Sequence, residues 1–537
     1  MTFLDRVRLT RRTLAKGAAL TAGAIVANAK PASANVHRGG LGMRHGPWRP
    51  DDDDDIALVN GNILTLDGRN SVASSVAIRG DRIVDVGVFG RPFRQCKQTI
   101  DLRGATVIPG LIDSHQHFIR ACHNPGYETR GIESATSIVE LQQALFVRAR
   151  GVPAGGFLTC IGGWNRNGLI EKRLPTPAEL DAAAPGHPVY LSETSGGGQA
   201  VTNTAGKSFF ASAGVTVNAD GTLNAAAALN ALRAAQTVSD RARGTADGIA
   251  WVSGLGLTGV ADQGGIPFAD WKDATNLWRS GKLDIRLRQY FNGNDSPDPL
   301  GYQTFVLNNH NKIGDDAFRV LGVGERVPGD LNAACAFLGA QGWTLTLHSL
   351  ALTENQQQVA AFQLAAQTYD IASLRWQLHH INDITPDLLQ TIAKLGIAVG
   401  LQSWRYLSTG PAPFRSCLDL GIPCGGGTDA TNVAAQNPWL HIYHMVTGLN
   451  NAGTLSNPGQ QISRIQALKM FTSGSAYLTF DEDKVGSIEE GKLADLVVLS
   501  DNVLTVPDDK LKKLSSNLTI LGGNVVHAAG RFAALAQ

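Results

Sequence analysis

Eight short apolar runs recur through the middle of the chain, and most are separated by stretches of helical character. Strands that alternate with helices favour a parallel sheet, and eight such strands predict a closed (β/α)8 TIM barrel of the α/β class. The interval 118–255 is far longer than one helix, so we expect a large insertion after the first strand that forms part of the substrate pocket. The eight runs are residues 110–117, 256–263, 284–291, 318–325, 343–348, 374–380, 396–402 and 421–429.

Both ends of the chain carry shorter β-rich runs. In the first part these runs alternate with turns, and a Gly-Asp dipeptide at 80–81 favours a tight hairpin. A similar pattern returns near the other end, beginning with the run 494–499. We therefore expect one small β-sandwich assembled from residues 56–108 and 479–537, with the barrel over 109–478 between its two parts. Two separate β-extensions are the alternative.

The first residues have the pattern of an export signal. Paired arginines at 11–12 precede an apolar run at 17–27 and an Ala-Ser-Ala sequence at 32–34, where a signal peptidase could cut. This arrangement resembles a twin-arginine signal and predicts a periplasmic or secreted protein. The apolar run is shorter than the ~20 residues that span a bilayer, which argues against the alternatives of a membrane anchor or a surface helix. We expect a signal peptide over 1–34 and a solvated linker over 35–55, whose five consecutive aspartates leave a calcium site as the alternative.

Composition narrows the class of partner. The 537 residues are 43% hydrophobic, which is ample for a large core with a satellite domain. The 47 basic and 46 acidic side chains leave a net charge of +1, so no electrostatic footprint points to nucleic acid or to an anionic membrane. A small-molecule substrate is therefore the expected partner, with a homo-oligomer left open. The six cysteines contain no C-x-x-C pair, and we expect most of them to be buried apolar residues.

Potential metal ligands gather at the ends of the predicted strands. His115 and His117 stand at i and i+2 at the end of the first run, so both imidazoles project from one face of a strand. A single H-x-H pair is a weak signal, and its strength comes from position. In a TIM barrel all strand ends open onto one face, where we expect these side chains to bind one or two Zn²⁺ or similar divalent ions. Five of the eight runs end in such a residue: His117, Glu325, His348, His380 and Asp429.

Several segments resemble a known family. Residues 101–117, DLRGATVIPGLIDSHQH, look like the opening metal motif of the amidohydrolase superfamily, and residues 467–499 resemble its closing signature. The segments at 163–165, 180–185 and 188–189 are similar to one branch of that superfamily, amidohydrolase family 3 with the N-substituted formamide deformylases. The similarity runs over nearly all of the chain beyond the predicted signal. It implies hydrolysis of a C–N bond in a small amide, formamide or cyclic amide.

The resemblance also implies a role for each candidate ligand. Two imidazoles and Asp429 would hold the more buried ion, and the other two imidazoles the second ion. Glu325 would bridge the ions, in place of the carboxylated lysine of many relatives. Asp429 would be the general acid/base that takes a proton from water and delivers it to the leaving nitrogen. The alternatives are a helix N-cap for Asp429 and a rim ion pair with Arg326 for Glu325. The implied histidine ligands are His115 and His117 for the first ion, and His348 and His380 for the second.

The chain departs from the branch at two places. It has His379-His380 where relatives carry Glu-His, and we expect His380 to face the metal and His379 to pack or to support it, because neighbouring strand residues point in opposite directions. The insertion lacks the usual histidine before Asn203, so its substrate-contacting or oxyanion role is either missing or covered by Gln199. We also expect substrate contacts from three softer candidates: Trp164, Asn165 and Asp262.

Other functions remain compatible with the same residues. Deamination, ester or lactone hydrolysis and decarboxylation can all use such a metal centre, and an inactive periplasmic binding protein is a rival from another class. His441 and His444 stand three residues apart on a predicted helix, where a second metal site competes with surface or supporting roles.

Overall fold

The computed structural model describes residues 54–87, 96–194, 199–264, 268–293, 301–407, 412–430 and 432–536. The predicted export signal and almost all of the predicted linker lie outside the described residues, so both stay predictions. All of the described residues belong to one unit of the chain, Gly42–Gln537. No helix in the described ranges is long and apolar enough to cross a membrane.

Eight parallel strands form the central sheet, and they follow the eight predicted runs in order. Backbone hydrogen bonds close the sheet on itself, because Asp429 N donates to His115 O at 2.8 Å and His117 N donates to Ala430 O at 2.9 Å. The predicted TIM barrel is therefore confirmed. Its strands are β8 (Leu111–Gln116), β14 (Leu257–Asp262), β15 (Arg286–Phe291), β16 (Phe318–Val323), β17 (Thr344–Ser349), β18 (Gln377–His380), β19 (Ala398–Gln402) and β20 (Cys424–Gly427).

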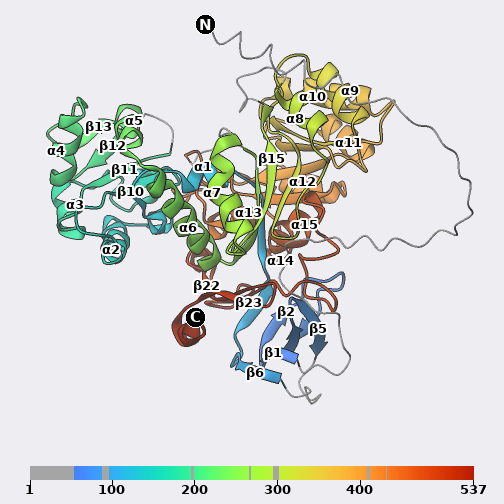
Figure 1. Ribbon diagram of the computed structural model, residues 1–537, viewed down its shortest axis with the longest axis horizontal. Coiled ribbons are helices and arrows are strands. Elements are labelled where there is room, and N and C mark those ends of the chain that lie inside the picture. Colours follow the sequence, from blue (N-terminus) through green and yellow to red (C-terminus); the bar gives the residue numbers. More distant parts are fainter. Residues whose placement is uncertain are drawn as a thin grey trace, which may run out of the picture. The chain divides into compact units, whose positions relative to one another are not determined.

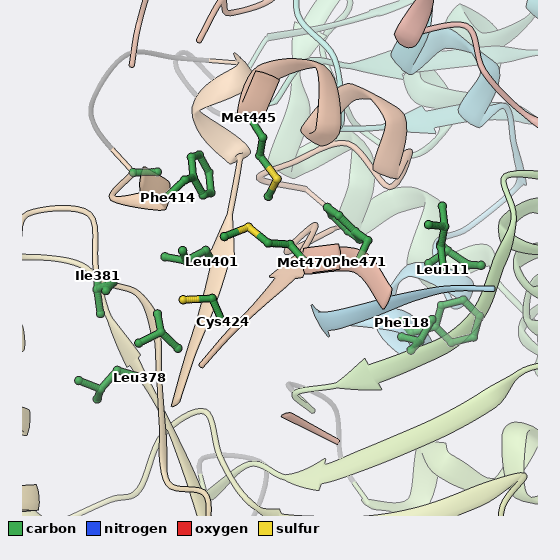
Figure 2. Packing of buried hydrophobic residues seen from close by; sticks show 14 of the residues in the cluster. Leu111, Phe118, Leu378, Ile381, Leu401, Phe414, Cys424, Met445, Met470 and Phe471 are labelled. Atoms are coloured by element: carbon green, nitrogen blue, oxygen red, sulfur yellow. The ribbon is translucent and has the colours of Figure 1, made fainter. Parts of the chain in front are cut away.

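The barrel strands are buried on both faces, which is why they read as nearly continuous apolar runs rather than as alternating ones. Figure 2 shows part of this core, where Leu378, Leu401 and Cys424 from three neighbouring strands lie near Met470 and Phe471 of the π-helix η7 (Met470–Gly474). Five of the six cysteines are buried, as the composition predicts.

Helices cover the outer face of the barrel, and local signals set their ends. For example, the Thr385 side chain accepts a hydrogen bond from Leu388 N at the start of α11 (Pro386–Leu395), Pro386 occupies the first turn, and Gly396 ends the helix with φ of 65°. The other helices of this layer are α6 (Val238–Gly254), α7 (Lys272–Arg279), α8 (Gly301–Asn308), α9 (Leu331–Ala340), α10 (Leu352–Ala365), α12 (Phe414–Asp419), α13 (Pro438–Thr447), α14 (Arg464–Lys469) and α15 (Ser475–Leu478).

The long interval after the first barrel strand folds into a layer of its own. It contains a five-stranded sheet in the order β13-β12-β11-β10-β9, drawn in teal and green in Figure 1. Leu158, Leu180, Leu191 and Val201 share a separate buried cluster, so the insertion has its own small core. Its strands are β9 (Tyr127–Glu128), β10 (Leu158–Ile161), β11 (Val189–Ser192), β12 (Gln199–Thr202) and β13 (Thr222–Asn224), and its helices are α1 (Phe118–Cys122), α2 (Ile138–Ala149), α3 (Pro177–Ala183), α4 (Thr204–Ser212) and α5 (Ala225–Ala235).

Both ends of the described chain meet in one β-structure. Figure 1 shows the first strands in blue beside the last strands in red, and the six-stranded sheet has the order β23-β22-β21-β7-β2-β3. A second sheet, β5-β4-β1-β6, shares its buried core, as shown by Leu58, Val107 and Val498 in one cluster. The alternative of two separate β-extensions is therefore wrong. The strands are β1 (Asp54–Val59), β2 (Asn62–Leu64), β3 (Val72–Ala73), β4 (Ser75–Arg79), β5 (Arg82–Gly87), β6 (Cys96–Asp101), β7 (Thr106–Pro109), β21 (Leu496–Leu499), β22 (Ser516–Leu521) and β23 (Asn524–Ala528).

Candidate metal centre

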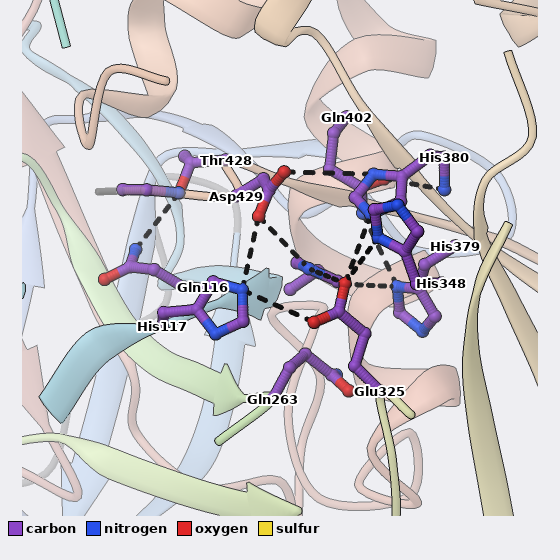
Figure 3. Close-up of polar contacts among 12 residues, drawn as sticks. Gln116, His117, Gln263, Glu325, His348, His379, His380, Gln402, Thr428 and Asp429 are labelled. Carbon is purple, nitrogen blue, oxygen red and sulfur yellow. Dashed lines mark hydrogen bonds and ion pairs between the residues drawn. The ribbon is translucent and has the colours of Figure 1, made fainter. Parts of the chain in front are cut away.

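The carboxyl ends of the barrel strands bring the predicted metal ligands together (Figure 3). They form three overlapping groups, and within each group the potential ligand atoms all lie within 4.8 Å of one another. The groups are His115, His380 and Asp429; His115, His117 and Glu325; and Glu325, His348 and His380. Six side chains that are spread over more than 300 positions of sequence thus share one buried site.

Glu325 lies at the centre of four imidazoles. Its Oε1 is 2.7 Å from His348 Nδ1, 3.5 Å from His380 Nε2 and 3.9 Å from His115 Nε2. Its Oε2 is 3.6 Å from His117 Nε2. Figure 3 shows the carboxylate between His117 on one side and His348 on the other. The side chain therefore points into the site. Within the described chain, Glu325 forms its ion pairs with these imidazoles and not with Arg326.

Asp429 faces the same imidazoles from the loop after β20. Its Oδ1 is 3.3 Å from His115 Nε2 and 3.5 Å from His117 Nε2, and its Oδ2 is 4.0 Å from His380 Nδ1. The next described helix begins at Pro438 and is capped by Asn437, so the N-cap alternative for Asp429 is wrong. Asp429 has φ of 57°, a left-handed conformation that costs roughly 1–3 kcal/mol and that clusters at functional sites.

The neighbouring residues His379 and His380 both contribute to the centre, which differs from the expectation that they point in opposite directions. His379 follows Gln377 on the interior face of β18, and its Nε2 lies 3.1 Å from Gln377 Oε1. His380 ends the strand with φ of 77°, so the strict alternation of a β-strand stops there. As a result His380 faces the two carboxylates, while His379 Nδ1 lies 2.7 Å from His115 Nδ1. His379 supports a candidate ligand instead of facing the carboxylates.

Contacts behind the imidazoles orient their free nitrogens. The contact with His379 occupies His115 Nδ1, and Gly264 O accepts from His117 Nδ1 at 2.8 Å, so Nε2 of both rings faces the carboxylates. Asp262 holds this arrangement, because its carboxylate accepts from Gly264 N and from Ile119 N, each at 2.7 Å. The structure thus places Asp262 differently from the substrate contact predicted for it: both of its oxygens are used by backbone N–H groups, and it positions the loop that orients His117.

The charges of the site are set by burial and by mutual contact. Burial raises the pKa of Asp429, but its contacts with His115 and the charge of His380 outweigh this and lower the pKa to about 2. The pKa of Glu325 lies well below its ordinary value, because its contacts with His348 and His380 and the charges of the other imidazoles outweigh the effect of burial. Burial lowers the pKa of His115 to about 4. At neutral pH the two carboxylates are therefore ionised and His115 is neutral, which are the forms that bind a metal ion.

The donor set fits a divalent cation. His115 Nε2 and both ring nitrogens of His380 are buried without a hydrogen-bond partner among the residues that the structure describes. Buried polar atoms are normally paired, so each such nitrogen needs an explanation. The spacing supplies one, because two ligand atoms about 2.1 Å from a tetrahedral zinc ion lie about 3.4 Å apart. Most of the imidazole to carboxylate distances given above fall near that value.

Three residues predicted to contact the substrate, Trp164, Asn165 and Gln199, lie outside the group of candidate metal ligands. Trp164 is 3% exposed and belongs to the core of the insertion. Asn165 joins the insertion to the barrel, because its Nδ2 donates to Leu407 O at 2.9 Å and its Oδ1 accepts from Asn451 Nδ2 at 2.7 Å. Gln199 is exposed, and its Oε1 accepts from Arg166 Nη2 at 2.6 Å. Each of these polar contacts is within the protein, so the structure brings none of the three side chains into the group of candidate ligands.

The two histidines of α13 are supporting residues of the barrel wall. His441 and His444 are 1% and 0% exposed, which excludes the surface role that was one of the expectations. His441 Nε2 lies 2.8 Å from Ala435 O and His444 Nε2 lies 3.1 Å from Ser456 Oγ. Neither residue belongs to a metal-ligand group within the described ranges.

A polar network beside the imidazoles was missed from the sequence. Asp113 lies two residues before His115 on β8, and it accepts from Gln116 Nε2 at 2.7 Å and from Thr428 Oγ1 at 2.6 Å. Burial raises the pKa of Asp113 to about 6. Gln402 Oε1 accepts from His380 N at 2.9 Å on the other side of the centre. The available signal was a charged residue inside a strand of apolar character, because such a residue needs buried partners.

Several known proteins are similar to this chain in sequence or in fold. The chain is 25% identical over 559 residues to N-substituted formamide deformylase from Arthrobacter pascens, covering 87% of this chain and 97% of the relative. An uncharacterized metal-dependent hydrolase from Pyrococcus furiosus has a similar fold, with a TM-score of 0.56, 21% identity and coverage of 84% of this chain and all of that one. Atrazine chlorohydrolase from Arthrobacter aurescens, solved in complex with zinc, has a TM-score of 0.52 at 17% identity, with coverage of 88% of this chain and 95% of that one. The sequence profile of the amidohydrolase family matches residues 98–527, and the chain therefore belongs to that family.

Proposed function

We propose that this amidohydrolase cleaves a C–N bond in a small amide, formamide or cyclic amide, with one or two Zn²⁺ or similar ions as cofactor. The observation that carries the proposal is a set of buried imidazole nitrogens that have no hydrogen-bond partner among the described residues and that face two ionised carboxylates at the barrel mouth. Similarity to a protein named N-substituted formamide deformylase over most of both chains supports the substrate class.

The proposed holders of the metal are the six clustered side chains. His115, His117 and Asp429 are the candidates for one position and His348 and His380 for the other, with Glu325 reaching both groups. When bound, such an ion lowers the pKa of water to near 7 and polarises a carbonyl oxygen. His379 and Gly264 keep the His115 and His117 rings in place, so little reorganisation is needed at the moment of reaction.

Asp429 is the proposed general acid/base. It is ionised at neutral pH and so can accept a proton from the attacking water, while the water oxygen forms a bond with the carbonyl carbon. When the C–N bond breaks, Asp429 returns that proton to the leaving nitrogen. The products are a carboxylic acid, which is formic acid for a formamide, and an amine; for a cyclic amide both groups stay in one ring-opened molecule, so in each case one water is consumed and the proton count balances.

A substrate panel with metal-analysed protein tests the proposal. Purified protein should contain about one to two divalent ions per chain and should release amine from some of the formamides, amides or cyclic amides in the panel. Asp429→Asn protein prepared in parallel controls for contaminating hydrolases. Turnover of esters, lactones or carboxylic acids without any amine release would show that the reaction is of another kind, and full activity in metal-free protein would overturn the metal-dependent mechanism.

A further inference from the structure

The insertion holds a short segment of the barrel that follows Asp429. Glu133 lies in the 3₁₀-helix η2 (Arg130–Ser134) of the insertion, and its side chain is fully buried. Its Oε2 accepts from Gln436 N at 2.9 Å and from Asn437 N at 3.0 Å. One carboxylate oxygen of the insertion thus pairs two successive backbone N–H groups at the end of the segment 432–437.

This carboxylate is itself fixed within the insertion. Arg130 Nη1 donates to Glu133 Oε1 at 3.0 Å. Gly163 leaves the space that the carboxylate occupies, because a Cβ at that position would lie 2.5 Å from Glu133 Oε1. Both oxygens of Glu133 are therefore used, one toward the insertion and one toward the segment 432–437. Hydrogen bonds to an ionised group are stronger than those between neutral groups, so this contact is a firm one.

The segment 432–437 is also bonded to the strand that carries two candidate metal ligands. Gln436 Nε2 donates to Gln116 Oε1 at 3.0 Å, and Gln116 stands between His115 and His117 at the end of β8. The same strand holds the chain just before the segment, because Asp429 N donates to His115 O at 2.8 Å. A displacement of the segment would therefore reach the metal centre both through the backbone and through Gln116.

A second contact of the insertion lies nearer to Asp429. Gly162 has φ of 73°, and a Cβ at this position would lie 2.5 Å from Asn432 O and 2.7 Å from Asn432 Cα. Both neighbours are backbone atoms, which cannot rotate away as the end of a side chain could. The insertion thus contacts the segment 432–437 at both of its ends, with a close approach at Gly162 and with hydrogen bonds at Glu133.

We propose that Glu133 is a positioning residue for the metal centre, because it holds the segment 432–437 and thereby fixes the orientation of Asp429. Its effect on metal binding rests on the proposed function, whereas its hold on the segment does not. Asp429 has φ of 57°, a left-handed conformation that persists only where the surrounding structure enforces it. The barrel strand β8 restrains Asp429 directly, and Glu133 restrains the chain that follows it.

Hydrogen exchange of the metal-free protein tests this hold directly. Glu133→Gln keeps the shape of the side chain, but its single amide oxygen can serve either the two backbone N–H groups or Arg130. We expect a peptide that contains Gln436 and Asn437 to exchange at least about tenfold faster than in the wild type. Glu128→Gln is the matched control, because Glu128 Oε2 lies 3.2 Å from Nε of the same guanidinium and its contacts in the described chain are within the insertion. That variant should leave the exchange of this peptide unchanged.

A second pair of variants displaces the segment from its other end. The methyl group of Gly162→Ala has to push Asn432 away, so the peptide over 432–437 should again exchange faster, even if Glu133→Gln does not fold. Gly155→Ala is the control for backbone strain. Gly155 lies in the same insertion with φ of 77°, but nothing lies within 4 Å of a Cβ at that position. This control should leave the exchange of the peptide unchanged.

Competition for Zn²⁺ with a chromophoric chelator then measures the effect on the metal centre. Glu133→Gln and Gly162→Ala should lower Zn²⁺ affinity by about 10–100-fold relative to their controls, as is typical of residues that support a ligand. Both glutamine variants disturb the same buried ion-pair group, so a mere loss of stability would affect Glu133→Gln and Glu128→Gln alike.

Three results distinguish the possible failures. The inference is overturned if Glu133→Gln and Gly162→Ala match their controls in hydrogen exchange. It is also overturned if exchange becomes faster while Zn²⁺ affinity stays at the wild-type value. Wild-type protein that binds no Zn²⁺ would count against the proposed function instead, and the exchange of the segment 432–437 would still decide whether Glu133 holds it.

Discussion

A cluster of charged or titratable side chains is buried at each end of the barrel strands, and the two clusters differ in the distances between their opposite groups. At the amino ends, Arg288 Nε donates to Asp481 Oδ2 at 2.6 Å and Arg286 Nε donates to Asp495 Oδ2 at 2.7 Å. Arg319 from the neighbouring strand also donates to Asp481. At the carboxyl ends, most of the distances between imidazole nitrogens and carboxylate oxygens are 3.3–4.0 Å.

The difference separates a structural cluster from a functional one. The arginine cluster is complete, since each carboxylate accepts hydrogen bonds from the guanidinium groups that face it, as buried ions require. The imidazole cluster is incomplete, since among the described residues His115 Nε2 and both ring nitrogens of His380 are buried and lie too far from the carboxylate oxygens to bond them directly. Catalytic residues of TIM barrels lie at the carboxyl face, while the opposite face serves stability. An added cation would complete the imidazole cluster, and nothing needs to be added to the arginine cluster.

The largest effect is expected from Asp429→Asn. The amide keeps the size of the side chain and one oxygen ligand but cannot accept the proton, so turnover should fall by the ~10²–10⁴-fold that is typical of a general acid/base. The melting temperature should stay within a few degrees of the wild type. Steady-state kinetics and thermal denaturation measure the two quantities. Near-normal turnover would show that Asp429 is not the proton acceptor.

Asp481→Asn makes the matching change in the arginine cluster and should have the opposite profile. It leaves the buried guanidinium groups of Arg288 and Arg319 without their counter-ion, which costs about 3–5 kcal/mol of stability. The metal content of the folded protein should be unchanged. Loss of metal without loss of stability would contradict the division between the two clusters.

The effect of Asp481→Asn should also depend on pH. Burial raises the pKa of Asp481, but the charges of Arg288 and Arg319 outweigh it, so the pKa in the folded protein is lower than the ordinary value near 3.9. A depressed pKa contributes stability that is fully present above the ordinary value and is lost as the pH falls through the folded value. The difference in stability between the two proteins should therefore shrink below about pH 4.

The sequence predicts the barrel better than it predicts the support of the site. The eight strands were recognisable because buried parallel strands are continuous apolar runs, and the candidate ligands were recognisable because each of five strands ends in one. The positions of His379 and Asp262 were not recognisable in the same way. The first depends on a left-handed residue that ends β18, and the second on backbone N–H groups brought near by the barrel closure. Such contacts are set by tertiary structure rather than by local pattern.

Glu325→Gln tests whether the central carboxylate completes the centre or merely pairs with the imidazoles. As a ligand change, it should lower metal affinity by more than the ~10–100-fold that is typical of a supporting residue, with activity falling in parallel. If Glu325 served only as the ion-pair partner of the imidazoles, its replacement would lower stability and would leave the bound metal intact. Elemental analysis after dialysis against a metal buffer distinguishes these cases. Full metal content with normal turnover would contradict the bridging role.

The smallest effect is expected from His379→Ala, and the neighbouring residue His380 provides the comparison, because the two residues lie on one strand but have different roles. His380 has two unpartnered nitrogens facing carboxylates, so His380→Ala should remove a ligand and lower metal content strongly. His379 contacts His115 and Gln377 instead, so His379→Ala should free the His115 ring and lower metal affinity by only about 10–100-fold. His379→Gln can still offer a polar atom to His115 Nδ1, and we expect it to recover part of that loss. Metal titration of the three variants gives the order, and a larger loss from His379→Ala than from His380→Ala would mean that the two roles are reversed.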